Sequence, residues 1–521
     1  MKNRKKIKIF DANPKILLLL ILIFACISRL YFFVGIGFND DSYYLEYAEK
    51  IYKGERFVPP STVEWGVRIA VYYPVVLFWK IFGISELSTS MYFILLSLAS
   101  IIVTYFIGKE LFNEEVGILG AFLLSILPLD IIYSTQVGPE IPLQFFSSSS
   151  ILLFIKSEKS KSYIYAFLSG LMLGFSYLAK SVIVVIIPIL VFFMFIEFLN
   201  RKKKNIILFI KRMDYKIYLI LILGFLSIFI LQVVHFYALT GEWFYGERVR
   251  SYFFTHDLNS NSDLWWYIKA IFNIGPFFNW IHIKPLFGFF YYFVVFSTIY
   301  LIYKRDKNSI FLAFWFLFIF AFFEFGLQFF CTKIMSYCLY ARHPRFLSIF
   351  SIPSMLLLAR FFTYENKKLW SIFSFLSILF LTITSLIFTY QSYIFLRNGM
   401  GYVREAVNFL IKLPEKIIYI PDGWTLSKFK FFSKYNDSFI NRLKIYECNI
   451  IDCRNEYYDK GDFIKDAYIV TDVSPYTYIN RISSYPNFMS NPPKKWILLK
   501  NITLKTIGIF SNYNPKIYYS P

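Results

Sequence analysis

The stretch ILLLLILIFACISRLYFFV (residues 16–34) is long and apolar enough to cross a lipid bilayer as one helix. A spanning helix needs about 20 predominantly apolar residues, because the hydrocarbon core of a bilayer is about 30 Å thick. Basic residues precede the stretch, and no small-residue cleavage site follows it. We therefore interpret it as an uncleaved first span rather than a signal peptide.

Similar apolar blocks recur along the chain. Hydrophobic residues make up 57% of the 521 residues, whereas a soluble domain averages about 45–50%. The surplus lies in blocks of about 17–25 residues divided by short charged loops, which predicts an α-helical polytopic membrane protein with about eleven spans. The predicted spans are 16–34, 88–107, 116–133, 140–155, 163–179, 182–198, 217–238, 286–303, 309–329, 346–362 and 369–395.

The distribution of charge predicts the sidedness of the loops. The net charge is +21, but most basic residues form short runs directly beside apolar blocks, which argues against nucleic-acid binding. Such runs retain a loop in the cytoplasm and contact anionic lipids. With the basic N-terminus inside, all but one of the loops that alternation makes cytoplasmic are rich in Lys or Arg. These loops are 108–115, 156–162, 199–216, 304–308 and 363–368.

Alternation places the remaining segments outside. A transmembrane domain over residues 1–395 then carries three outer loops, 35–87, 239–285 and 330–345. The segment 396–521 differs in pattern, with an amphipathic helix over 402–414 and strands over 416–421 and 467–473. We expect this tail to form a small extracytoplasmic α/β domain of ordinary size.

Two adjacent acids, Asp40 and Asp41, follow closely on the first span in GFNDDSYYLEYAEKIYKGE (residues 37–55). Adjacent carboxylates near the membrane surface suit a general base, a metal ligand or a cation site. The structural alternative is helix capping, with Asn39 or Asp40 starting a helix whose dipole favours acids in its first turn. Both interpretations are open at this point.

Further charged residues stand at the outer ends of later spans. Glu140 begins the fourth span next to Pro139, where it is either a functional acid or a favourable first-turn acid. Basic groups at the outer ends are candidates for binding phosphate, and their alternative role is to anchor helix ends at the interface. These basic candidates are Lys180, Arg342, His343 and Arg345.

The predicted topology places all of these candidates on the outer side. Capping and anchoring residues need not concentrate on one face, whereas group transfer from a membrane phosphate carrier needs a base, a second acid and a phosphate-binding set together. The concentration therefore favours the functional interpretation.

Five blocks of sequence resemble the GT-C superfamily of glycosyltransferases, in particular the dolichyl-phosphate-mannose–protein mannosyltransferases and the lipid A aminoarabinose transferases. The first block, FNDDSYYLEYAEKIYKG, resembles the acidic first-loop motif of that branch. The other four occur in the family's order, and the resemblance runs from about residue 16 to 200 and returns at about 335–362. They are RIAVYYPVVLFWKIFGISE (68–86), LFNEEVGILGAFLLSILPLDIIYSTQVGPEIP (111–142), LSGLMLGFSYLAKS (168–181) and RFLSIFSIP (345–353).

This resemblance implies inverting transfer of a sugar from a polyprenyl-phosphate or dolichyl-phosphate carrier to an extracytoplasmic protein or lipid glycan. It implies Asp40 as the base that deprotonates the acceptor, with Asp41 and Glu140 supporting it or binding the acceptor. The basic candidates would hold the carrier phosphate, which is also the leaving group. The family's second acid is usually Glu, whereas here it is Asp41, so which acid is the base stays open.

The resemblance leaves two alternatives. The oligosaccharyltransferase branch uses a divalent metal, but the predicted outer loops hold no DxD or DxH motif, so we expect no metal and no other cofactor. The competing function is a transporter or flippase for a lipid-linked glycan, for which charges near mid-membrane are typical. The predicted spans carry few central charges, with Glu324 as the main exception.

Overall fold

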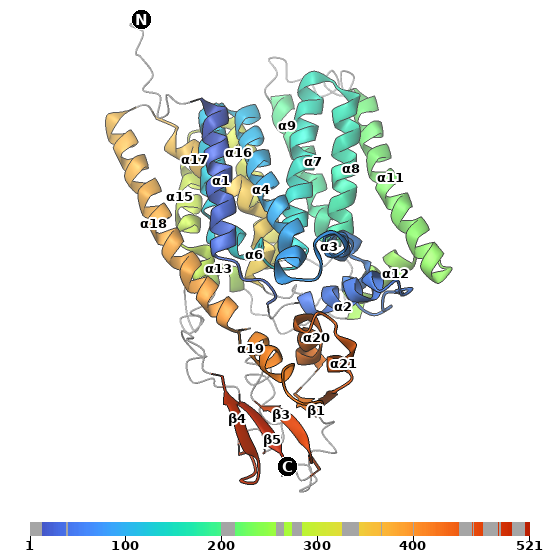
Figure 1. The fold of residues 1–521 in the computed structure, drawn as a ribbon. Coiled ribbons are helices and arrows are strands. Elements are labelled where there is room, and N and C mark those ends of the chain that lie inside the picture. The colour runs from blue at the N-terminus through green and yellow to red at the C-terminus, as the bar shows by residue number, and fades with distance from the viewer. Residues whose placement is uncertain are drawn as a thin grey trace, which may run out of the picture. The chain divides into compact units, whose positions relative to one another are not determined.

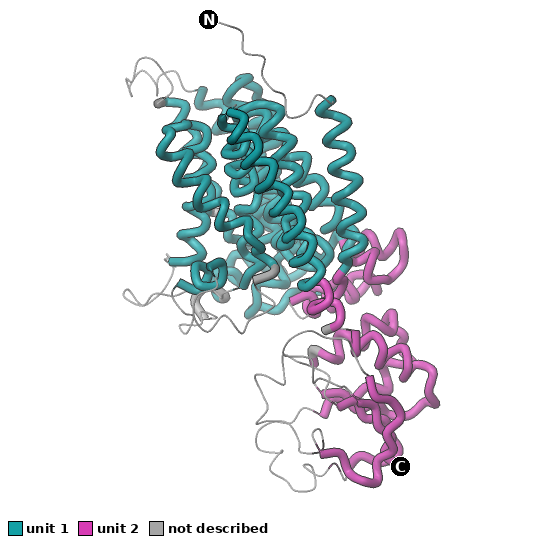
Figure 2. The backbone as a smooth tube through the Cα atoms, turned by 90° about the vertical axis from the view of Figure 1, so that its left-hand side faces the viewer, with its two compact units in different colours: residues 1–33, 56–74, 90–392 teal, residues 34–55, 75–89, 393–521 magenta. Residues whose placement is uncertain are grey.

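A computed structural model describes the chain in two compact units (Figure 2). Unit 1 comprises residues 1–33, 56–74 and 90–392, and unit 2 comprises residues 34–55, 75–89 and 393–521. Unit 2 thus combines parts of the predicted first outer loop with the tail. The described residues are 13–37, 40–199, 214–256, 265–272, 284–325, 343–365, 367–399, 401–421, 423–446, 461, 463–471, 488, 491–502 and 516–521.

Unit 1 consists of helices, with no strand among its described residues (Figure 1). Three helices, α3, α4 and α18, have residues in both units. The helices of this part of the chain are α1 (Pro14–Tyr31), η1 (Glu64–Val67), α3 (Ile69–Phe82), α4 (Glu86–Leu111), α5 (Glu114–Ser125), α6 (Pro128–Tyr133), α7 (Glu140–Ser160), α8 (Tyr163–Ala179), η2 (Ser181–Val185), α9 (Ile186–Leu199), α11 (Tyr215–Thr240), α12 (Tyr245–His256), α13 (Trp266–Phe272), α14 (Lys284–Phe287), α15 (Phe290–Tyr303), α16 (Lys307–Phe325), η4 (Pro344–Phe350), α17 (Ser351–Phe362) and α18 (Lys368–Gly399).

Among the described residues, 7 helical segments are long and apolar enough to cross a membrane, and three shorter apolar helices accompany them. The predicted span 116–133 is divided into α5 and α6. The division occurs at Pro128, which lacks an N–H and begins α6 after the extended Leu127. The apolar helix α3 lies within the predicted outer loop 35–87. The count of eleven spans therefore stays a prediction.

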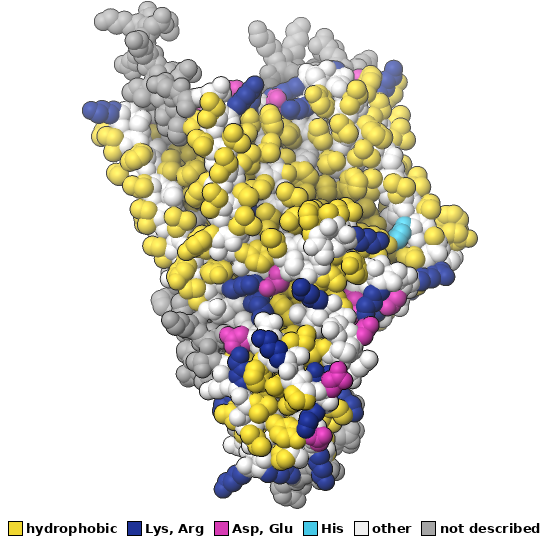
Figure 3. Space-filling view, in the orientation of Figure 1, with side chains coloured by type: hydrophobic (Ala, Val, Ile, Leu, Met, Phe, Trp, Pro, Cys, Tyr) yellow, Lys and Arg dark blue, Asp and Glu magenta, His cyan; other side chains and the backbone are white. Residues whose placement is uncertain are grey.

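The outward faces of the helices are apolar, as a lipid environment requires. In α1, for example, Ile16, Leu19 and Ile27 are each more than half exposed. Hydrophobic side chains cover most of the helix surface on the face seen in Figure 3. With no water in the bilayer core, only helices or closed barrels satisfy their backbone there. This is a multi-pass membrane protein.

The described parts of the loops predicted to be cytoplasmic lie at one end of unit 1 (Figure 1). Lys159 contacts Glu110, which joins loop 156–162 to loop 108–115. Tyr163 donates to Asp214 at 2.9 Å, and Lys304 lies 3.9 Å from Glu365. The predicted alternation of the spans is consistent with these contacts. Which end faces the cytoplasm stays a prediction.

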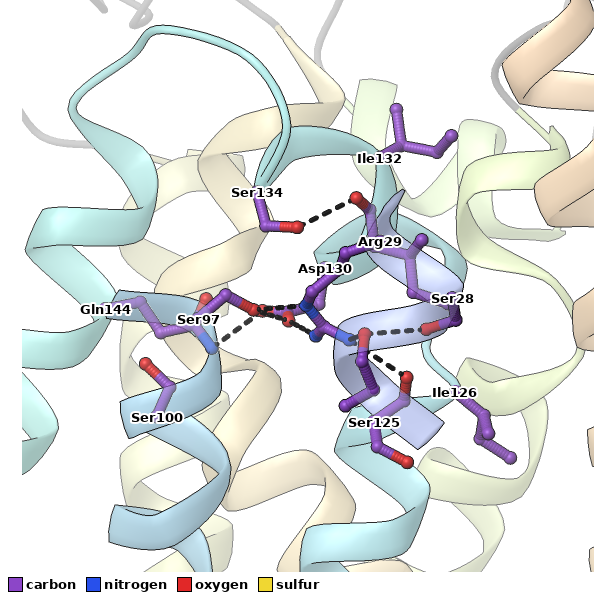
Figure 4. A network of polar contacts seen from close by, with 12 residues as sticks. Ser28, Arg29, Ser97, Ser100, Ser125, Ile126, Asp130, Ile132, Ser134 and Gln144 are labelled. Atoms are coloured by element: carbon purple, nitrogen blue, oxygen red, sulfur yellow. Dashed lines mark hydrogen bonds and ion pairs between the residues drawn. The ribbon is translucent and has the colours of Figure 1, made fainter. Parts of the chain in front are cut away.

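A buried ion pair crosses the interior of unit 1 (Figure 4). Arg29 Nη2 of α1 lies 2.5 Å from Asp130 Oδ2 of α6, and both side chains are fully buried. Ser97 donates to Asp130 Oδ2 at 2.6 Å, and Gln144 Nε2 donates to Asp130 Oδ1 at 3.0 Å. The expectation that Glu324 is the main charge near the centre of a predicted span stays a prediction. Arg29 and Asp130 stand in the predicted spans 16–34 and 116–133, where sequence analysis passed over them.

Unit 2 contains a mixed five-stranded sheet in the order β2-β1-β3-β5-β4. Strand β1 pairs in parallel with β2 and β3, whereas β5 pairs antiparallel with β3 and β4. The predicted tail helix and both predicted strands are present as α19, β1 and β3. The elements are α2 (Asp41–Tyr52), α19 (Gly401–Leu410), β1 (Ile417–Ile420), α20 (Gly423–Phe432), α21 (Asp437–Ile440), β2 (Leu443–Ile445), β3 (Ala467–Thr471), β4 (Ile497–Asn501) and β5 (Lys516–Ser520).

The period-two alternation of β3 divides the core of the tail between the two faces of the sheet. Tyr468 and Val470 pack with the apolar face of α19 and with Phe429 of α20. Ala467 and Ile469 pack on a second cluster. Because both faces are covered, β3 is buried along its whole length.

Candidate functional site

The acid pair of the first outer loop lies at the start of α2 in unit 2. The helix begins at Asp41, and Asp40 occupies the N-cap position without a capping hydrogen bond from its side chain. Asp40 is partly exposed, whereas Asp41 is 1% exposed. Side-chain capping by Asp40 therefore does not account for the pair.

Asp41 is held by backbone amides. Its Oδ2 accepts a hydrogen bond from the amide of Gly37 at 2.6 Å, and its Oδ1 accepts one from Ser42 at 3.0 Å. Burial raises the pKa of Asp41 to about 6, although Lys428 and the Gly37 amide act in the opposite direction. A carboxyl group in this range changes charge close to physiological pH.

A second constellation, in unit 1, brings together three of the predicted residues. Glu140 is the first residue of α7, Lys180 follows α8 in an extended conformation, and Arg345 lies in η4. Glu140 Oε1 lies 3.5 Å from Lys180 Nζ and 3.3 Å from Arg345 Nε. Residues from three separate helical segments thus converge on one carboxylate.

The basic residues of this constellation do not act as interfacial anchors. Lys180 and Arg345 are 3% and 7% exposed, whereas an anchoring side chain extends its charged end into water. The ammonium of Lys180 lies 3.7 Å from the centre of the Phe346 ring. Such burial of cations is costly unless they are paired, so it points to a function or a specific structural need.

His343 and Arg342 complete the predicted basic set. His343 caps η4, with its Nδ1 accepting a hydrogen bond from the amide of Arg345 at 3.3 Å. It therefore orients the turn that carries Arg345. Arg342 lies outside the described residues.

Sequence analysis missed an ion pair that adjoins this constellation. Glu64 and Arg68 of the η1 segment form a buried salt bridge, and Ser181 donates to Glu64 Oε1 at 2.5 Å. Ser181 directly follows Lys180. A possible indication was the i, i+4 spacing of two opposite charges at the edge of an apolar stretch, in EWGVRIAV.

The charges of this region do not cancel. Three cations (Arg68, Lys180, Arg345) face two carboxylates (Glu64, Glu140), and we call these five residues the cationic cluster. Burial, helped by the charges of Arg68 and Arg345 and opposed by that of Glu140, lowers the pKa of Lys180 to about 8. Burial by itself would raise the pKa of Glu64, but Arg68 and Ser181 lower it to about 2. Taken by themselves, these five side chains carry a formal charge of +1.

The described residues contain no group of three or more His, Cys, Asp or Glu side chains suited to a metal ion. The predicted outer loops also include residues outside this described part of the chain. The expectation of no metal therefore stays a prediction.

Comparisons with known proteins agree with the fold of this chain. Residues 69–235 match the family described as dolichyl-phosphate-mannose-protein mannosyltransferase. ArnT from Cupriavidus metallidurans bound to undecaprenyl phosphate superposes with a TM-score of 0.54 at 12% identity, covering 97% of each chain. The fold is of the GT-C type. The resemblance of the sequence motifs to this superfamily is thereby confirmed.

Two further proteins are similar to this chain. The oligosaccharyltransferase AglB from Archaeoglobus fulgidus, solved with an inhibitory peptide and a dolichol-phosphate, has a TM-score of 0.52 and 14% identity, covering 93% of this chain and 73% of its own. An uncharacterized protein of Aquifex aeolicus (strain VF5) is 25% identical over 132 residues. That alignment covers 24% of this chain and 26% of the relative, so it spans about a quarter of each.

Proposed function

We propose that this protein is a membrane glycosyltransferase that moves a sugar from a polyprenyl-phosphate carrier to an extracytoplasmic protein or glycolipid. The observation that carries the proposal is the cationic cluster, in which buried Lys180 and Arg345 leave an excess of positive charge. Bidentate guanidinium groups and ammonium groups are the usual partners of phosphate. The phosphate carriers bound by the ArnT and AglB structures support the same ligand class.

In the proposed reaction, Asp40 takes the proton of the acceptor as the acceptor atom attacks the anomeric carbon of the sugar. The bond from that carbon to the phosphate oxygen breaks, and the polyprenyl phosphate leaves with the electron pair, so the configuration inverts. The cationic cluster stabilises the charge that develops on the leaving phosphate. Asp40 suits the role of base because it is partly exposed, whereas the buried Asp41 suits a supporting role.

Reconstituted vesicles test this function directly. Purified protein is incubated with radiolabelled polyprenyl-phosphate sugars and membrane extracts containing protein and glycolipid acceptors. We expect the label to leave the carrier and to appear on one acceptor class, with free polyprenyl phosphate as the second product. If the intact labelled lipid instead crosses the vesicle membrane and its sugar stays on the carrier, the protein is a transporter.

Arg345→Gln should weaken the binding of the donor. We expect its KM for the polyprenyl-phosphate sugar to rise by about 10- to 100-fold, since a hydrogen bond to a charged group contributes about 1.5–3 kcal/mol. Arg360→Gln is the matched control, because Arg360 lies at the other end of the same helical segment and pairs with Asp306 at 2.7 Å. An unchanged donor KM in Arg345→Gln would contradict the assignment.

The pH profile of kcat/KM should be bell-shaped. Below about pH 6 Asp41 is protonated, which weakens the hydrogen bond that its carboxylate accepts from the Gly37 amide. Above about pH 8 Lys180 is deprotonated and no longer attracts phosphate. A bound phosphate stabilises the ammonium, so the alkaline limb should be weaker in kcat, which reports the complex. In Lys180→Arg the alkaline limb should disappear because arginine stays charged. An alkaline limb that persists in this variant would belong to another group.

A further inference from the structure

An ionic clamp in unit 2 joins the first outer loop to the tail. Glu86, the first residue of α4, accepts hydrogen bonds from two arginines of the tail. Arg404 Nε lies 2.9 Å from Glu86 Oε2 and Arg404 Nη2 lies 2.6 Å from Oε1, a bidentate arrangement. Arg397 Nη1 lies 2.9 Å from Glu86 Oε1. We call these three residues the clamp.

The clamp also grips the backbone that precedes the acid pair. Arg397 and Arg404 both donate to the carbonyl of Val34, at 2.8 and 3.2 Å, and Glu86 Oε1 accepts the amide of Ile36 at 3.2 Å. Gly35, between Val34 and Ile36, has a φ of +74°. A Cβ atom at this position would collide with the Glu86 side chain and lie 2.9 Å from the Arg397 guanidinium. Donors and acceptors of the clamp thus hold the loop from both sides.

The held segment leads directly to Asp41. One residue after Ile36, the amide of Gly37 donates to Asp41 Oδ2 at 2.6 Å. A displacement of residues 34–37 would therefore disturb the hydrogen bond that holds the buried carboxylate of Asp41.

Helix α20 of the tail makes a second contact with the acid-bearing helix α2. Ser427 Oγ donates to the carbonyl of Ser42 at 3.2 Å. Beyond α20, Tyr435 Oη donates to the carbonyl of Leu45 at 3.3 Å. Lys428, next to Ser427, is 4% exposed, and its charge favours ionised Asp41 by lowering the pKa of that carboxyl.

From these contacts we propose that the tail positions the acid pair for catalysis, and that Glu86, Arg397 and Arg404 are the positioning residues. This inference rests on the proposed transferase function. The tail then contributes to catalysis, and loosening its contacts should slow turnover rather than alter acceptor choice alone. Small misplacement of a reacting group is enough, since a shift of about 1 Å costs on the order of 100-fold in rate.

Variants of the clamp test this inference through the division between kcat and KM. Arg404→Ala should lower kcat by about 10- to 100-fold and leave the donor KM within about twofold, because the cationic cluster is untouched. Arg404→Lys, which keeps the charge but loses the bidentate geometry, should fall between Arg404→Ala and the unchanged protein. Combining Arg404→Ala with Glu86→Gln should cost little more than either change alone, because both break the same clamp.

Hydrogen exchange provides a readout that does not depend on activity. The amides of Ile36 and Gly37 should exchange at least about tenfold faster in Arg404→Ala, since the local structure that protects them is loosened. Lys416→Met is the matched control, because Lys416 forms its ion pair with Asp466 at the sheet, and it should change neither exchange in the loop nor kcat.

The outcomes separate the two proposals. Unchanged exchange and unchanged kcat in Arg404→Ala, with transfer still abolished by changes in the acid pair, would overturn the clamp and leave the proposed function intact. If no sugar transfer is found for the unchanged protein, the proposed function fails, and the positioning role fails with it. Faster exchange in Arg404→Ala would then show a structural contact only.

Discussion

Replacing Asp40 by asparagine is expected to lower the rate of sugar transfer by about 100- to 10,000-fold, the usual contribution of a positioned general base. Asparagine has nearly the same shape but does not accept the acceptor's proton. The loss should appear in kcat, while the donor KM stays near that of the unchanged protein, because the cationic cluster is intact. Asp41→Asn should cost less, since this buried side chain supports the loop through the Gly37 amide.

The control for both changes is Asp437→Asn. Asp437 also begins a short helix of unit 2, α21, but its side chain is 81% exposed. Its ion pair with Lys53 is therefore weakened by solvent, and its replacement should leave transfer unchanged. Size-exclusion profiles in detergent show whether each variant is folded. Full activity of Asp40→Asn, Asp41→Asn and the double variant would remove the acid pair from the mechanism. A larger loss in Asp41→Asn than in Asp40→Asn would exchange their roles.

Replacing Arg29 by methionine should cost about 3–5 kcal/mol of unfolding free energy, because it leaves the carboxylate of Asp130 buried without its ion partner. The guanidinium also donates to Ser97 at 2.9 Å and to the carbonyls of Ala25 and Ser125. Together with Gln144 of α7, the network in Figure 4 therefore joins α1, α4, α5, α6 and α7. Thermal unfolding of the purified protein in detergent measures the effect.

A double variant shows whether Arg29→Met destabilises the protein because Asp130 loses its ion partner or because the packing around Arg29 is lost. The double variant Arg29→Met with Asp130→Leu should recover much of the stability, since both charges are removed together. Lys109→Met is the control, because its pair with Glu114 is exposed and should leave the unfolding midpoint unchanged. If Arg29→Met unfolds at the same temperature as the unchanged protein, the pair does not stabilise the bundle.

Much of the candidate site follows from sequence because sidedness follows from local patterns. Apolar blocks and basic loops predicted that Glu140, Lys180 and Arg345 lie on one side, and the structure brings both cations within 3.5 Å of Glu140. The sequence did not predict Glu64 and Arg68 as site residues, because the short helix η1 lies in a loop and shows no hydrophobic periodicity. The charges of Arg29 and Asp130 were visible inside predicted spans, where an ionisable residue is itself informative.

The sequence by itself determined that this protein is a helical membrane protein of GT-C type, with its acids and cations at predictable ends of spans. These properties depend on hydropathy, charge bias and motif order, which are patterns that extend over tens of consecutive residues. Only the tertiary structure decided which charges are paired, that Asp41 is buried, and that the tail grips the first loop. Glu86 and Arg404 stand 318 positions apart, and no local pattern specifies which of the tail's many basic residues will meet that carboxylate.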